Sequence, residues 1–418
     1  MKPLLRYTLY IALFAGIVYW ATAITFLPFM PAVKSGGFEK FNSTFKLDTV
    51  SFGTGARTDG ETFWIGNAYV CKGINPLPYL MGAEPLDGMI APVYNTPYLP
   101  WSYVIGQVFI PGFLSFDFSL GWYLFLSLVL YVWMGVLVFK TVKRVSGDRL
   151  LAVLALVCCL AQYGISPSLK FLNMSFIVIP LIVIAVLTGG GEYKKKSKFL
   201  NIQKHDLLAG IMLGLAMVKP QMAALFFIPF LFQKRFIPVI VGALVVALGW
   251  GTMAVLSNQN PWQLFMDYQT ASSERVDSWI PPFYTGILDG FRLMQVSSGT
   301  LFMPQVLLCV SCVLFFSYKL KNAPAYISFL APAVFSTCWI YTMPTNIPVL
   351  AIMIVAILLS LHNSKAFLWL LLLLLLLLLP TPEMFRRSFP VIFPLLQRLV
   401  YLAGMIFIIY LYKQNKTE

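Results

Sequence analysis

The sequence has few charged residues. Only 11% of its 418 residues are charged, whereas a soluble domain carries about 25%. Hydrophobic residues make up 59% of the chain. Many of them stand in apolar runs of roughly 17 to 25 residues, which is the length that crosses a bilayer as a helix. This composition argues against a soluble domain and predicts an all-α integral membrane protein.

Several motifs of known chemistry are also absent. The sequence contains neither G-x-x-x-x-G-K-[ST] nor G-x-G-x-x-G, which disfavours nucleotide-driven reactions. The six cysteines have neither zinc-site spacing nor the arrangement of a disulfide framework. The two histidines, His205 and His362, fall at predicted helix ends beside cationic loops. No histidine is therefore left on the outer side of the membrane for a Ser/His/Asp triad.

The apolar runs predict about 12 transmembrane helices with both termini in the cytoplasm. We interpret the first run, Thr8 to Phe29, as an uncleaved span. The run 99–113 is short and is interrupted by proline and glycine, so we expect a re-entrant or interfacial helix there. The other eleven expected spans lie at about 119–139, 150–166, 173–188, 206–218, 221–232, 237–256, 300–317, 325–342, 346–361, 365–380 and 391–412.

The distribution of charge supports this topology. It places 18 of the 30 lysines and arginines on the cytoplasmic side and 12 outside, as the positive-inside rule expects. Acidic residues divide in the opposite sense, with 4 inside and 12 outside. The net charge of +14 therefore reflects membrane topology, and part of it also serves contacts with membrane lipids. We expect no nucleic-acid partner.

Two long polar segments remain outside the membrane. The first outer loop spans 30–98 and belongs to a catalytic module expected at 1–235. The second spans 258–299 and belongs to a C-terminal module expected at 236–418. The stretch 57–100 holds carboxylates, aromatic residues and six prolines. Since lipid-exposed irregular backbone is not tolerated at membrane depth, this polar loop is where chemistry can take place.

Asp59 is the first candidate for that chemistry. It lies in Thr58-Asp59-Gly60-Glu61, just ahead of an aromatic cluster that includes Trp64. A carboxylate within reach of an acceptor hydroxyl can take its proton as the hydroxyl attacks. The structural alternative is a solvated carboxylate of the kind that any long outer loop contains.

Lys219 is the second candidate, because it is embedded in the apolar run 207–232. A lysine can neutralise a phosphate and so stabilise a leaving group. The alternative is a lysine that extends to the interface at the tip of a helical hairpin, where Pro220 makes the turn. That alternative also places Lys219 on the outer face. Lys170 and Asn173 stand in another tight outer turn.

Aromatic residues mark two further surfaces. The proline-rich segment from Tyr94 to Trp101 either forms an interfacial belt or lines a groove for a sugar or a lipid. In the second outer loop, Trp262, Trp279 and several acids indicate a surface for an acceptor, because aromatic rings favour sugar faces.

The order of these motifs resembles glycosyltransferase family 87. The segment from Thr58 to Pro76 resembles the family's first-loop pattern, in which an Asp precedes a Tyr/Trp cluster and a Gly-x-(Asn/Asp)-Pro ending. Residues 92–97 resemble the Tyr-Pro-Pro segment that follows, and residues 208–221 resemble the family's Lys-Pro helical hairpin. Residues 170–173 occupy the place of its Gly-Gln-x-Asn turn. The resemblance covers roughly the first 235 residues.

The resemblance implies a GT-C-like fold in an inner or plasma membrane, with neither metal nor cofactor. The family includes a polyprenol-phosphate-mannose-dependent mannosyltransferase. By resemblance, the donor would be a polyprenyl-phosphate sugar, and the acceptor a glycolipid or lipid-linked glycan of the cell envelope. Asp59 would be the catalytic base, and Lys219 would contact the donor phosphate. The other residues that we expect to bind substrate are Glu61, Trp64, Tyr94, Lys170, Asn173 and Gln221.

Two other functions remain open on the sequence. A glycan polymerase or ligase would use polyprenyl-diphosphate donors and depend on arginines in its outer loops. The chain has four such arginines: Arg275, Arg292, Arg386 and Arg387. A transporter or flippase would have charged residues at mid-membrane and internal repeats, and the sequence shows neither.

Overall fold

The computed structural model describes most of the chain between Asp59 and Thr417. The described stretches are 59–80, 98–162, 172–189, 204–278, 298–339, 344–363 and 392–417, with shorter pieces within 7–18, 83–89, 165–168 and 369–377. Within these residues every regular element is a helix, which confirms the predicted all-α class.

The helices follow one another along the chain with few long connections. They are α3 (Asp59–Cys71), α4 (Leu77–Leu80), α5 (Pro100–Gly106), α6 (Phe116–Ser146), α7 (Arg149–Leu160), α9 (Ser175–Gly189), α10 (Lys204–Ala216), α11 (Pro220–Ala223), η2 (Ala224–Phe226), α12 (Phe227–Phe232), α13 (Phe236–Leu256), α14 (Pro261–Ser278), α15 (Ser298–Lys319), α16 (Ala325–Ser328), α17 (Leu330–Phe335), η4 (Pro344–Leu350), α18 (Ala351–Asn363) and α21 (Ile392–Thr417).

Three of the described helices are long and apolar enough to cross a membrane. They are α6, α13 and the part of α21 from Leu395 to Gln414, and they correspond to the spans expected at 119–139, 237–256 and 391–412. Shorter apolar helices of 10 to 17 residues, among them α7, α9 and α18, accompany them. These helices make the chain a membrane protein, whereas the number of twelve spans stays a prediction. The span expected at 365–380 lies largely outside the described residues.

The span expected at 325–342 is interrupted. Helix α16 ends at Ser328, and Phe329 leaves the helical conformation with φ −99° and ψ 7° before α17 begins. Pro332 explains the break, because proline has no N–H to donate to the carbonyl of Ser328 four residues earlier. The described part of this apolar run therefore consists of two short helices, and its crossing of the membrane stays a prediction.

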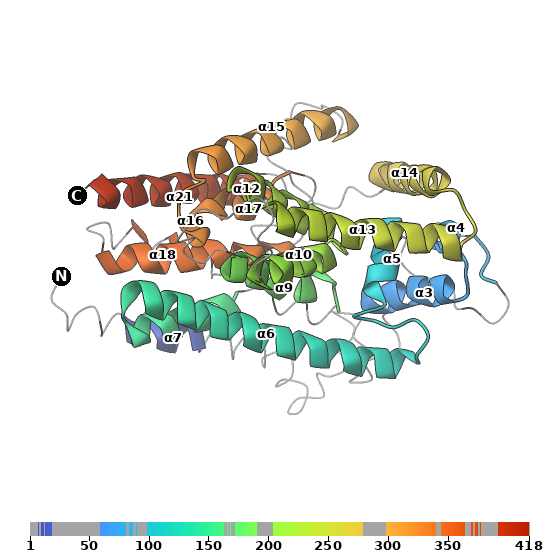
Figure 1. Cartoon of the computed structure of the whole chain (residues 1–418), viewed down its shortest axis with the longest axis horizontal. Helices are drawn as coiled ribbons and strands as arrows, with labels where there is room; N and C mark the ends of the chain where they lie inside the picture. The colour runs from blue at the N-terminus through green and yellow to red at the C-terminus, as the bar shows by residue number, and fades with distance from the viewer. Residues whose placement is uncertain are drawn as a thin grey trace.

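Figure 1 shows how the helices are arranged. Helices α3, α4 and α14 gather at one end of the long axis, and the C-terminal end of α21 lies at the other end. The seven-residue helix α5 packs on α3, where the rings of Phe63 and Tyr103 stack with centroids 5.6 Å apart. The short helix expected within 99–113 is thus present, and it ends at Gly106.

Helices α10 and α13 approach closely because α10 carries small residues on one face. A Cβ atom added to Gly210 would lie 2.7 Å from Cβ of Val241, and one added to Gly214 would lie 2.7 Å from Cβ of Val245. Small residues at such spacing let membrane helices pack backbone to backbone. This contact crosses the module boundary expected at 235, and the division into two modules stays a prediction.

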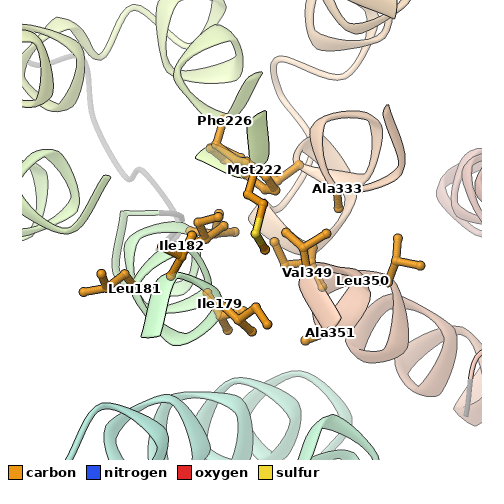
Figure 2. Packing of buried hydrophobic residues seen from close by; sticks show 14 of the residues in the cluster. Ile179, Leu181, Ile182, Met222, Phe226, Ala333, Val349, Leu350 and Ala351 are labelled. Atoms are coloured by element: carbon orange, nitrogen blue, oxygen red, sulfur yellow. The ribbon is translucent and has the colours of Figure 1, made fainter. Parts of the chain in front are cut away.

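Helix α9 occupies the centre of the bundle. Nearly all of its residues are buried, as expected for a helix that is apolar on every side. Figure 2 shows the side chain of Met222 pointing between Ile182 of α9 and Val349 of η4. Met222 and Val349 each lie three residues after a polar residue, Lys219 and Asn346 respectively. The apolar packing therefore holds the two turns that carry those polar side chains.

Candidate active site

Asp59 begins helix α3 and meets the turn that precedes α9. The Nδ2 group of Asn173 donates a hydrogen bond of 2.6 Å to Oδ2 of Asp59. The backbone of Leu172, just before Asn173, has a left-handed φ of 51°, which aims the Asn173 side chain toward α3. A half-buried carboxylate is thus held by a buried amide.

Lys219 reaches the same amide from a third element. It lies in the turn between α10 and α11, and its Nζ donates to Oδ1 of Asn173 at 2.8 Å and to Oγ of Ser175 at 2.5 Å. The Asn173 amide therefore bridges the carboxylate and the ammonium. Among the described residues these two oxygens are the hydrogen-bond partners of Lys219. Since an ammonium carries three N–H donors, one donor of Lys219 has no partner among the described residues and could bind a ligand.

The third side of the cluster comes from the C-terminal half of the chain. Oγ of Ser175 lies 2.7 Å from Oδ1 of Asn173 and 2.8 Å from Oδ1 of Asn346 in η4. On the other side, the hydroxyl of Tyr123 in α6 donates to the Asn173 carbonyl at 2.9 Å. The bridging turn is therefore fixed from two directions before any substrate arrives, as preorganised catalysis requires.

The surroundings of Lys219 make its ammonium group easier to deprotonate. The side chain is only 3% exposed. Burial lowers the pKa of Lys219 to about 8, and the negative charge of Asp59 opposes that decrease. Lys219 thus carries its charge at neutral pH and loses it in mildly alkaline solution.

A glycine brings α3 and the Asn173 turn together. A Cβ atom at Gly60 would lie 2.6 Å from Cβ of Leu172 and 3.1 Å from the Leu172 carbonyl oxygen. No side chain fits at position 60 without moving one of the two segments. The 2.6 Å contact between Asp59 and Asn173 depends on this close approach.

The structure brings together three of the sequence-predicted site residues: Asp59, Asn173 and Lys219. Glu61 lies about 200° around α3 from Asp59, because successive helical residues are about 100° apart. The indole N–H of Trp64 donates to the carbonyl of Leu114 at 3.1 Å and so ties α3 to the start of α6.

Of the remaining predicted residues, Gln221 lies two residues after Lys219, and two others are not described. The carbonyl of Gln221 accepts a hydrogen bond of 2.6 Å from the indole of Trp339. Tyr94 and Lys170 lie outside the described residues. Within the part of the chain that the structure describes, no group of three or more His, Cys, Asp and Glu is placed to hold a metal ion.

Ser175, Asn346 and Tyr123 are site residues that the sequence did not single out. Ser175 follows Asn173 by two residues, so the local turn could have indicated it. Asn346 is separated from Ser175 by 171 residues and stands in an apolar context, which gives no sequence signal.

The segments expected as the two outer loops contact each other. Nδ2 of Asn75, between α3 and α4, donates to Oδ2 of Asp267 in α14 at 3.1 Å. Helix α14 also presents Trp262, which is 67% exposed. The segment that we expected to receive an acceptor thus adjoins the loop that carries Asp59.

Comparison with known proteins gives one match. The family model described as Glycosyltransferase family 87 matches residues 103–344, which is more than half of the chain. The matched region includes Asn173 and Lys219, begins after Asp59, and extends beyond the region in which the sequence motifs resemble the family. No curated protein and no solved structure matches the chain. The family resemblance is confirmed, and the chain belongs to glycosyltransferase family 87.

Proposed function

We propose that this membrane glycosyltransferase moves a monosaccharide from a polyprenyl-phosphate sugar to a glycolipid or lipid-linked glycan, with inversion at the anomeric carbon. The reaction takes place on the outer face of an inner or plasma membrane, and both termini are cytoplasmic. The observation that carries the proposal is the Asn173 amide, which holds the Asp59 carboxylate and the Lys219 ammonium on its two ends.

Asp59 acts as the general base. The acceptor oxygen attacks C1 of the sugar while the Asp59 carboxylate takes the hydroxyl proton. At the same time the bond from C1 to the phosphate oxygen breaks, and the leaving phosphate keeps the electron pair. The hydrogen bond from Asn173 orients the carboxylate but leaves it ionised, since an amide N–H donates to a carboxylate without giving up its proton.

Lys219 holds the leaving phosphate. Its positive charge stabilises the negative charge that develops on the phosphate oxygen in the transition state. The lysine is buried among apolar helices, where an electrostatic contact is stronger than in water. A phosphate that accepts a hydrogen bond from Lys219 would lie across the Asn173 amide from Asp59. The base and the leaving group would then share one site.

The helix directions support an outer position for this site. Helix α6 ends in Lys143 and Arg144, and Figure 1 places that end of α6 away from α3. Helix α21 also ends away from α3, with Lys413 near its C-terminus. Basic residues favour the cytoplasmic side, so the end that carries α3, α4 and α14 is the outer one on this reading.

Purified protein in lipid nanodiscs tests the function. We expect transfer of labelled sugar from a polyprenyl-phosphate donor to a glycolipid extract, with inverted configuration in the product. Transfer only from polyprenyl-diphosphate donors would instead support a polymerase or ligase. Mass spectrometry of surface glycolipids from a deletion strain should identify the missing product and thus the acceptor.

A further inference from the structure

A third buried cation, Arg398, lies outside the region that the family model matches. Arg398 lies in α21, six residues after the helix begins at Ile392. At a rise of about 1.5 Å per residue, it lies about 9 Å from the start of the helix. The side chain is nevertheless only 2% exposed, so it faces the interior of the protein.

Arg398 lacks the carboxylate partner that the buried Arg235 has in Asp206. Both arginines lie over an aromatic ring, Arg235 over Phe230 and Arg398 over Tyr401. Nε of Arg398 donates to the carbonyl of Thr337 at 2.9 Å, and its Nη1 donates to Oε1 of Gln397 at 3.0 Å. Both acceptors are neutral. Among the described residues no carboxylate forms an ion pair with Arg398, and a buried charge without a counter-charge is costly.

The surroundings of Arg398 are polar and lead back to the candidate active site. Thr337 is two residues from Trp339, whose indole N–H donates to the Gln221 carbonyl at 2.6 Å. The Trp339 carbonyl in turn accepts from the buried side chain of Gln305 at 3.3 Å. These groups connect Arg398 to the turn that carries Lys219 through an otherwise apolar bundle.

We propose that Arg398 binds the phosphate group of a membrane lipid that places its headgroup between α17 and α21. A guanidinium presents a planar fork of N–H donors that matches phosphate oxygens. Among the described residues, Arg398 donates hydrogen bonds through Nε and Nη1 alone. Long arginine side chains near the end of a membrane helix extend toward the depth of the lipid phosphates. The ligand is a phosphate ester on an apolar chain, from either a polyprenyl phosphate or a phospholipid.

Lipid binding tests this site without sugar transfer, so its result is independent of the proposed function. Thermal unfolding of the full-length protein in neutral detergent is followed during titration with farnesyl phosphate, farnesol or phosphatidylglycerol. Farnesol controls for the apolar chain. Leu399→Met, at the exposed neighbouring position, controls for substitution in this turn of α21.

We expect the phosphate lipids, but not farnesol, to raise the unfolding temperature of the wild type. Arg398→Met should weaken their apparent affinity about tenfold, as expected for loss of a charge-assisted hydrogen bond, and Leu399→Met should not. An effect on farnesyl phosphate alone would assign the site to a polyprenyl phosphate. An effect on phosphatidylglycerol alone would assign it to a phospholipid, and an effect on both to the shared phosphate group.

Equal affinity of Arg398→Met and the wild type for both phosphate lipids would overturn the proposal. Arg398 would then only neutralise the carbonyl-rich end of α17. If Arg398→Met does not fold, Arg398→Lys decides. It keeps a positive charge near Thr337 but loses the guanidinium fork, so we expect several-fold weaker binding. Unchanged affinity of Arg398→Lys would also contradict phosphate recognition by the fork.

Discussion

Gly60→Ala should inactivate the enzyme by moving α3, although it removes no functional group. The new Cβ atom would lie 2.6 Å from Cβ of Leu172, whereas carbon atoms in contact are about 3.5–4.0 Å apart. One segment must therefore shift by about 1 Å. The hydrogen bond of 2.6 Å between Asn173 and Asp59 would lengthen beyond its normal range.

Such a shift should cost more in rate than in stability. Overpacking a core position costs about 1–3 kcal/mol, whereas a displacement of 1 Å at a reacting group can lower the rate about 10²-fold. The assay is single-turnover transfer with thermal unfolding measured in parallel. Gly121→Ala is the matched control, because a Cβ at position 121 on α6 meets nothing within 4 Å. A Gly60→Ala enzyme as fast and as stable as Gly121→Ala would refute the close approach of α3 to the Asn173 turn.

Four further predictions concern Lys219, its supports and the topology. Donor binding should weaken between pH 7 and pH 10, because Lys219, with a pKa of about 8, loses its charge as the pH rises. Lys219→Arg should remove this pH dependence, and the same pH profile in the arginine variant would contradict the role of Lys219. Lys219→Ala should weaken donor use by about 1–3 kcal/mol in steady-state kinetics, and unchanged donor kinetics would exclude the contact. Asn346→Ala, which removes the partner of Ser175, should cause a smaller loss of donor affinity than Lys219→Ala, and a larger loss would mean that the amide itself binds substrate. In a variant without native cysteines, an impermeant reagent added from outside should label cysteine at position 58 and not at position 197, and the reverse would overturn the topology.

The helical class and the long spans could be predicted because they depend on local composition. Helices α6 and α13 are long, continuous and apolar, so their positions follow from the sequence within a few residues. The break between α16 and α17 was less visible, since the residues around Pro332 are as apolar as those of a continuous span. A single missing backbone donor decides the structure there, and hydropathy does not report it.

The candidate site could be predicted only where residue type and motif coincide. Lys219 stands out because a charge inside an apolar run is rare, and Asn173 occupies the place of a family motif. Their meeting with Asp59 is a long-range contact, 114 residues apart for Asn173, which a single sequence does not encode in any periodic pattern. Arg398 also stands in an apolar run, but the sequence alone does not tell whether it faces lipid, water or protein.

Replacement of Asp59 by Asn tests the proposed chemistry most directly. Asp59→Asn keeps the shape of the side chain but cannot accept a proton. General-base catalysis contributes about 10²–10⁴-fold, so the variant should fold, bind donor and turn over at most about a hundredth as fast. Glu61→Gln is the control, since it removes an equally acidic group on another face of α3 and should cost much less. An equal loss in both variants would mean that the effect is not specific to a base at position 59. A well-folded Asp59→Asn enzyme with near-normal transfer would show that Asp59 is not the base.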